Sequence, residues 1–451
     1  MREIVSPGNT KTPSASGVGN YRWRIVALLF FATTINYIDR NVLSFTMIDE
    51  PFRKTMLGLP LGATLTTADT DRFKELMGYV DGAFKAAYAL GFVLVGWFID
   101  RVGTRKGFAW AIVVWSAAGI ANAFVGSVRG LGFTRFMLGL GEAGNFPSAV
   151  KSVAEWFPKK ERAFATGLFN AGSNIGIIAT AFAVPLITLH YGWRVSFVVT
   201  GLLGLVLVVC WLWIYRKPED QPGISQAELD HIRSDGDETE TGTRKISWGK
   251  LLAHRQTWAL ATGKFLADPI WWFYLTWLPD FFNSSEALDQ KLDLKNISLP
   301  FLFIYIVSDA GSIFFGWLSS HFIKNGWPVG KARKTTMLIC ALCVVPIVFA
   351  SVTSSIYIAV ALIALATAAH QGWSANVYTM SSDMFPKSTV GSVMGIGGMA
   401  GALGGVILAT FAGVIRVKFG YAPLFIIAGS NYLLALLIIH WLVPKWDKAA
   451  V

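Results

Sequence analysis

The chain has 451 residues, with 39 Lys and Arg against 28 Asp and Glu, which gives a formal net charge of +11. Hydrophobic residues make up 53% of the chain and charged residues only 15%. This composition is typical of an integral membrane protein. No basic tract interleaved with aromatic residues indicates nucleic-acid binding, so membrane topology explains the net charge.

Apolar stretches long enough to cross a bilayer recur along the whole chain. A helix needs about 20 residues to cross the hydrocarbon core, and windows of about that length predict twelve spans. The predicted spans are 25–47, 79–99, 107–127, 131–150, 164–187, 193–215, 257–282, 299–320, 335–353, 356–380, 390–414 and 421–443.

A polar interruption at 216–255 divides the spans into six and six, because it begins with a Pro- and Gly-containing string and continues with acidic, Ser- and Thr-rich sequence. The sequence therefore predicts an all-α membrane protein with two six-helix bundles. The predicted parts are a tail at 1–24, bundles at 25–215 and 256–443, the linker, and a tail at 444–451. Most Lys and Arg fall in the tails and in loops on the linker side, which predicts that both termini are cytoplasmic.

The three cysteines, Cys210, Cys340 and Cys343, all lie in predicted spans. Neither a disulfide framework nor a soluble zinc site is indicated, and packing explains them best. We expect no metal and no cofactor other than protons as the coupling ion. A phosphate-binding loop of the Walker type is also missing from the sequence, which disfavours ATP-driven transport.

Several charged side chains lie inside the predicted spans. Each costs roughly 2.5 to 3.5 kcal/mol at a helix centre, so such groups are expected to face a wet cavity or one another. Six charged residues lie at such positions, and four of them are basic. This indicates a path for an anion beside carboxylates that could carry a proton. The six residues are Asp39, Arg40, Lys85, Arg135, Glu142 and Lys264.

Arg135 and Glu142 are seven residues apart, which places them on one helix face, two turns or roughly 10 Å apart. An anion that neutralises Arg40 or Arg135 would weaken the hold of these cations on Glu142 or Asp39 and favour protonation, so that anion and proton bind together. The alternative is a structural ion pair that locks the first and fourth spans. Both interpretations can hold in different states.

The loop between the second and third spans follows the pattern G-x-x-x-D-R-x-G-x-R-K, formed by Gly96, Asp100, Arg101, Gly103, Arg105 and Lys106. This pattern resembles the loop signature of the major facilitator superfamily. The resemblance implies twelve helices in two bundles around a central site, with the loop acting as a latch when the cavity opens outward. Topology alone would explain Arg105 and Lys106, but not the spaced glycines with Asp100.

Further motifs resemble the anion:cation symporter family, and the bacterial hexuronate transporters within it. They are 36–40, 135–143, 155–162, 264–272 and 370–385. The resemblance implies that Asp39 and Glu142 couple protons and that Arg40 and Arg135 hold substrate or carboxylate partners. It also places Tyr37 and Tyr88 in the cavity, and Lys264 in a region where relatives vary.

Other polar and aromatic residues are candidates for reading the hydroxyl groups and ring faces of a sugar. Each has an alternative role: interhelical hydrogen bonds for the Asn and His residues, and interface anchoring for the Trp residues. Lys85 and Asp268 could pair with each other or line the cavity, and the role of Asp309 stays open. The candidates are Asn170, Asn174, Trp271, Trp272, His370 and Gln371.

The resemblance implies a proton-coupled symporter that imports a sugar-acid anion, with a hexuronate as first choice, across a bacterial inner membrane. We expect it to work as a monomer whose partners are the small-molecule anion and the lipid bilayer. An aldonate or aldarate carrier is the alternative within transport. A sensor that binds a sugar acid without moving it is the alternative of another class.

Overall fold

The computed structural model describes residues 19–234, 248–385 and 387–449. Six long helical segments precede the linker and six follow it, and no strand occurs in these ranges. This confirms the predicted helical fold class. By length and composition, eight of the described helices are apolar enough to cross a membrane. The first bundle consists of α1 (Tyr21–Thr46), α3 (Thr67–Val102), α4 (Thr104–Ala121), α5 (Val128–Glu142) with α6 (Asn145–Trp156), α7 (Lys159–Tyr191) and α8 (Trp193–Ile214).

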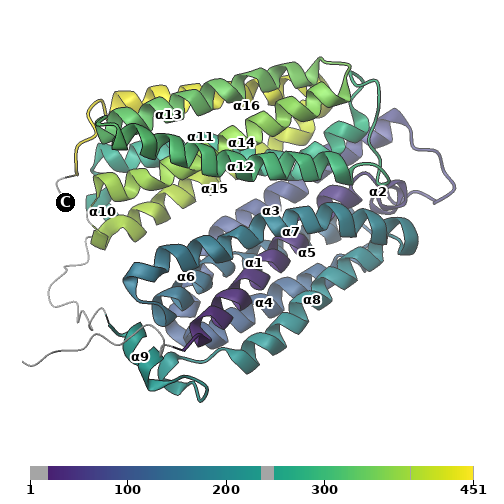
Figure 1. Cartoon of the computed structure of the whole chain (residues 1–451). Helices are drawn as coiled ribbons and strands as arrows, with labels where there is room; N and C mark the ends of the chain where they lie inside the picture. Colours follow the sequence, from purple (N-terminus) through teal and green to yellow (C-terminus); the bar gives the residue numbers. More distant parts are fainter. Residues whose placement is uncertain (1–18, 235–247, 386, 450–451) are drawn as a thin grey trace, which may run out of the picture.

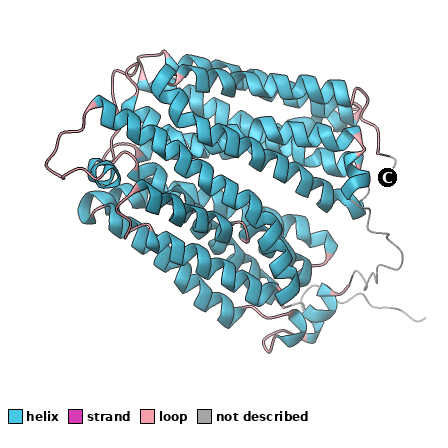
Figure 2. Ribbon diagram, turned by 180° about the vertical axis from the view of Figure 1, so that it is seen from behind, coloured by secondary structure: helices cyan, strands magenta, loops and turns pink. Residues whose placement is uncertain are grey.

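The second bundle lies beside the first, and the two pack along their length with α3 against α15, α1 against α11 and α7 against α12 (Figures 1 and 2). The short α2 (Glu50–Leu57) lies at the end of the molecule away from the linker (Figure 1). The second bundle consists of α11 (Arg255–Ser284), α12 (Ser298–Lys324), α13 (Val329–Val344), α14 (Ile356–Met384), α15 (Lys387–Phe419) and α16 (Ala422–Leu442).

Several helices differ from the predicted spans. The helix α3 begins at Thr67 rather than at 79, because Thr66 and Asp69 form a reciprocal capping box on a polar turn that hydropathy does not count. The span predicted as one helix at 131–150 is two helices, α5 and α6, with a turn at 143–144. Hydropathy finds the apolar part of a helix but neither its polar ends nor a break within it.

The linker is partly helical, with α9 (Gln226–Ile232) and α10 (Trp248–Leu252). Glu161 at the start of α7 binds Arg22 at 3.0 Å and His231 of α9 at 2.8 Å. Partial burial opposes ionisation, but the hydrogen bonds from His231 and Arg22 outweigh it and lower the pKa of Glu161. Glu228 of α9 also pairs with Arg22, at 3.4 Å. The first part of the linker is therefore tied to the N-terminal bundle.

Candidate substrate and proton site

The centre of the N-terminal bundle holds a buried ion pair between α1 and α5. Arg40 Nε donates to Glu142 Oε2 at 2.8 Å, and Arg40 Nη2 donates to Asn36 at 3.3 Å. Glu142 is fully buried, and its other oxygen, Oε1, has no hydrogen-bond partner. Removing charges from water costs more than one incomplete pair returns, so the free oxygen makes the ionised form of this carboxylate costly.

Close helix packing places this pair. A Cβ atom at Gly141 would lie 2.6 Å from the backbone nitrogen of Trp115, so only glycine allows α5 to approach α4 at this depth. Glu142 follows directly and is held at the last turn of α5. The close approach of α5 to α4 thus sets where the carboxylate lies.

Arg135 lies two turns earlier on α5 and binds the backbone of α1. Its Nη2 donates to the carbonyl of Arg40 at 3.0 Å and its Nη1 to the carbonyl of Asp39 at 3.5 Å, while Nε has no partner. The guanidinium also lies 4.8 Å from the centre of the Phe84 ring. Arg135 and Glu142 therefore share the site without a direct bond.

Asp39 is turned away from Arg40. Its carboxylate lies toward α4, 3.8 Å from where a Cβ at Gly119 would be, with Thr200 of α8 beside it. The Thr200 hydroxyl donates to the Phe197 carbonyl, and neither oxygen of Asp39 has a hydrogen-bond partner. A buried ionised carboxylate without hydrogen bonds is very costly, so this surrounding disfavours the charged form of Asp39.

Tyrosines surround the Arg40 guanidinium. Its central carbon lies 4.7 Å from the ring centres of both Tyr37 and Tyr88. Such faces stabilise a cation without neutralising it. Tyr88 also meets Trp272 of the other bundle edge to face, with ring centres 5.8 Å apart. Two predicted cavity tyrosines and one predicted tryptophan thus meet where the bundles join.

The C-terminal bundle contributes a second ion pair, Lys264 with Asp268 on α11, at 2.7 Å. Lys264 also lies 4.7 Å from the ring centre of Tyr378 on α14. Tyr378 is 50% exposed. The sequence analysis missed Tyr378, because a tyrosine in an apolar span looks the same whichever way it faces.

His370 forms an interhelical hydrogen bond, as one alternative expected. Its Nδ1 lies 2.6 Å from the hydroxyl of Tyr432 on α16, and its ring stacks on Trp271 at 5.0 Å. Gln371 is half-buried on the same helix, α14. A cavity role for His370 stays a prediction, as do the other predicted roles of individual residues.

Lys85 and Asp268 do not pair with each other, because each binds another residue of its own helix. Lys85 binds Asp81, four residues earlier on α3, at 2.6 Å and lies 5.5 Å from the ring centre of Trp272. Asp81 in turn accepts a hydrogen bond from Thr276 of the other bundle at 3.4 Å. The i, i+4 spacing of Asp81 and Lys85 was the signal that could have found this pair.

Asn170 and Asn174, the two candidates on α7, differ in their surroundings. Asn174 donates to Asp309 of α12, whereas Asn170, one turn earlier, is exposed. Asp309 thus has an interbundle partner that the sequence left open.

The signature loop is held within its own bundle. Gly103 joins α3 to α4 with φ +87°, a conformation that favours glycine. Arg105 donates to the carbonyl of Leu212, and Thr104 donates to Glu155 at 2.6 Å. The side chain of Asp100 lies outside the described residues, so the predicted latch stays a prediction.

The central cavity is small. Residues of both bundles, among them Arg40, Lys85, Arg135 and Trp272, line about 20 Å³ of free volume, which holds about one water molecule. A larger cavity of about 730 Å³ lies elsewhere, between α13 and α16, and contains none of the predicted site residues. In this conformation the arginines are closely surrounded, so a substrate the size of a sugar must displace side chains.

Comparison with known proteins agrees with this architecture. The family model of the Major Facilitator Superfamily matches residues 29–409. The hexuronate transporter of Escherichia coli (strain K12) is 30% identical over 435 residues, which cover 95% of each chain. The D-galactonate transporter of Escherichia coli O6:H1 is 30% identical over 91% of this chain and 93% of its own.

Among solved structures, the crystal structure of a D-xylose-proton symporter has the same fold. It superposes with a TM-score of 0.72 at 15% identity and covers 95% of this chain and 100% of its own. The chain therefore belongs to the Major Facilitator Superfamily and is a membrane transporter rather than an enzyme.

Proposed function

We propose that this transporter imports a sugar-acid anion, with a hexuronate such as glucuronate or galacturonate as first choice, together with protons across a bacterial inner membrane. Both termini lie in the cytoplasm and the protein works as a monomer. The observation that carries the proposal is the buried Arg40–Glu142 pair, in which Glu142 has one free oxygen and Arg40 sits between two tyrosine faces.

Coupling follows from competition for one cation. A substrate carboxylate that binds Arg40 displaces Glu142, because Arg40 Nε cannot serve both acceptors fully. The displaced carboxylate is then buried without a counter-ion, so it takes a proton. Asp39 already lacks a partner and holds the second proton position. Binding of anion and proton is thus mutually favourable.

The two bundles divide the recognition of the substrate. Arg40, with Arg135 or Lys264, holds the carboxylate, and Tyr37, Tyr88, Trp271 and Trp272 offer ring faces and polar edges to the sugar. Rocking of the bundles about this site gives alternating access.

Uptake by proteoliposomes with a panel of labelled sugar acids, with and without an imposed proton gradient, tests the proposal. We expect concentrative uptake of glucuronate or galacturonate that requires the gradient. Galactonate and glucarate belong in the panel, because the galactonate transporter is as similar to this chain as the hexuronate transporter. Preference for either would select the aldonate or aldarate alternative. Binding without uptake would select the sensor.

A further inference from the structure

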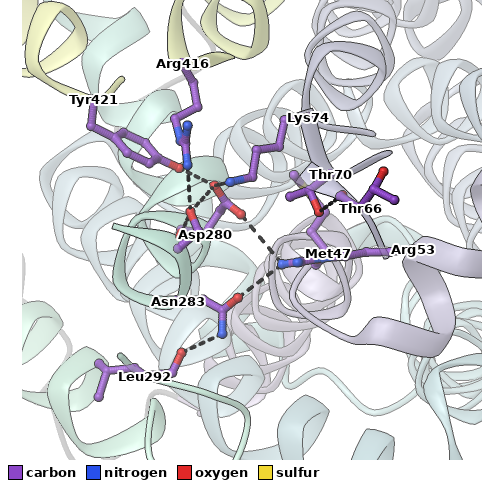
Figure 3. A network of polar contacts seen from close by, with 11 residues as sticks. Met47, Arg53, Thr66, Thr70, Lys74, Asp280, Asn283, Leu292, Arg416 and Tyr421 are labelled. Carbon is purple, nitrogen blue, oxygen red and sulfur yellow. Dashed lines mark hydrogen bonds and ion pairs between the residues drawn. The ribbon is translucent and has the colours of Figure 1, made fainter. Parts of the chain in front are cut away.

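A second buried charge cluster joins the two bundles (Figure 3) at the end where α2 lies, away from the linker (Figure 1). Asp280, near the end of α11, pairs through Oδ1 with Arg53 of α2 at 3.7 Å and through Oδ2 with Lys74 of α3 at 3.4 Å. Tyr421 and Ser284 also donate to Oδ2. Arg53 further donates to Asn283 at 3.1 Å. Both oxygens of Asp280 are thus satisfied, by partners from both bundles.

The cluster has more positive than negative charge. Arg53, Lys74 and the nearby Arg416 surround Asp280, and the carboxylate of Asp49, at the start of α2, also lies near Arg53, so three cations face two acids. Lys74 is only 1% exposed and Asp280 only 2%. A buried excess of positive charge is costly, and it favours the arrival of an anion.

The pairs cannot persist through a transport cycle. Arg53 and Lys74 belong to the first bundle, whereas Asp280 and Arg416 belong to the second. Alternating access requires the bundles to separate at this end, and separation removes Asp280 from Arg53 and Lys74. Two cations that are buried in the closed state would then face the outside without Asp280 between them.

We propose that Arg53 and Lys74 form an outer capture site for the substrate carboxylate, and that Asp280 takes the place of that carboxylate when the bundles close. When Asp280 replaces the substrate carboxylate on Arg53 and Lys74, the anion is released toward Arg40. The ion pairs of the closed state form again in the same step. This inference rests on the proposed function, because it takes the cargo to be a carboxylate. It gives Asp280 a second role, as a tethered competitor of the substrate.

Uptake kinetics in right-side-out vesicles distinguish a cluster that binds the substrate from one that only holds the two bundles together. Asp280→Asn should lower KM for glucuronate, because the competitor is gone, and lower the maximal rate, because closing loses its ion pairs. Adding Arg53→Gln to Asp280→Asn should then raise KM about tenfold, the factor for one lost charge-assisted hydrogen bond. If Arg53 only latches the bundles, the double variant will match Asp280→Asn, and capture is overturned. Lys291→Gln, an exposed lysine in the loop before α12, is the control for loss of charge.

A chemical probe decides the question even if no sugar acid is transported. Asn283→Cys is placed in the Asp280→Asn protein after Cys210, Cys340 and Cys343 are replaced by serine. A negatively charged sulfonate thiol reagent should modify it several-fold faster than a positively charged ammonium reagent. Lys74→Gln should remove that preference and Lys291→Gln should leave it. Equal rates for the two reagents with Lys74 present would overturn the capture site, whereas absence of uptake in the unaltered protein overturns only the proposed function.

Discussion

The ion pairs at the centre of the two bundles differ in how completely they are satisfied. In the N-terminal bundle, both oxygens of Asp39, Glu142 Oε1 and Arg135 Nε are buried without a partner. In the C-terminal bundle, Lys264 and Asp268 bind each other and His370 binds Tyr432. Unsatisfied buried groups are costly and persist where a change of partner is useful. Under the proposed function, this difference assigns the coupling chemistry to the N-terminal bundle and a supporting role to the other.

The largest difference between the bundles is expected for their carboxylates, Glu142 in the N-terminal bundle and Asp268 in the C-terminal bundle. Glu142→Gln should abolish proton-driven accumulation while exchange of substrate across the membrane continues, because the amide cannot carry the proton. A gradient of one pH unit is worth about tenfold accumulation per proton, so the loss is readily measured in proteoliposomes. Asp268→Asn, the matched change in the other bundle, should keep accumulation. Proton-driven uptake that survives in Glu142→Gln would remove this residue from coupling.

Substitution of Arg40 in the N-terminal bundle should likewise change KM more than substitution of Lys264 in the C-terminal bundle. Arg40→Lys keeps the charge but loses the fork that can bind a carboxylate and the planar contact with two tyrosines, so KM should rise about tenfold. Lys264→Arg should change KM by less than about threefold, since Lys264 acts as a point charge on Asp268. Initial rates of uptake over a range of substrate concentrations measure both. Unchanged affinity in Arg40→Lys would take Arg40 out of the substrate site.

Close packing supports the N-terminal cluster. Gly141→Ala places a Cβ 2.6 Å from the backbone nitrogen of Trp115, and overpacking of this kind costs about 1–3 kcal/mol. Thermal unfolding in detergent should therefore show a lower Tm. Gly398→Ala in α15, where a Cβ meets nothing within 4 Å, should not lower it. Equal melting temperatures for the two variants would contradict the close approach of α4 and α5.

The hydrogen bond between His370 and Tyr432 tests the supporting role of the C-terminal bundle. Tyr432→Phe removes one buried bond of 2.6 Å and should cost about 1 kcal/mol of stability. The KM for the sugar acid should stay the same, because the bond joins two helices of one bundle. A rise in KM without a loss of stability would instead make His370 a substrate residue, the role first expected from its depth in the membrane.

The smallest effect concerns the linker, where the partly buried cluster around Glu161 contrasts with the two deeply buried clusters. Since hydrogen bonds lower the pKa of Glu161, its contribution is complete above the ordinary glutamate value of 4.5 and is lost as pH falls through the lowered pKa. A spin label at Ala227 of α9 should stay immobile from pH 7 to about 5 and loosen only below 4.5. Glu161→Gln should loosen it at every pH. Loosening between pH 7 and 5 would exclude Glu161 as the cause.

The sequence by itself determined the class of the molecule and its family. Apolar stretches of bilayer length and the polar linker predict two helical bundles, and the signature loop predicts the superfamily that the comparisons show. The sequence also identified most charged residues within the spans, because the cost of burying a charge belongs to the residue type and its apolar surroundings.

Only the tertiary structure decided which of these groups meet. Successive residues on a helix point about 100° apart, so Asp39 and Arg40 must face different neighbours. Only the packing shows that Asp39 faces α4 and that Arg40 faces Glu142. The same holds for Lys85, which pairs with Asp81 rather than Asp268, and for Tyr378 and the Asp280 cluster. Rotation and register of packed helices set these contacts, and they depend on residues far away in the chain.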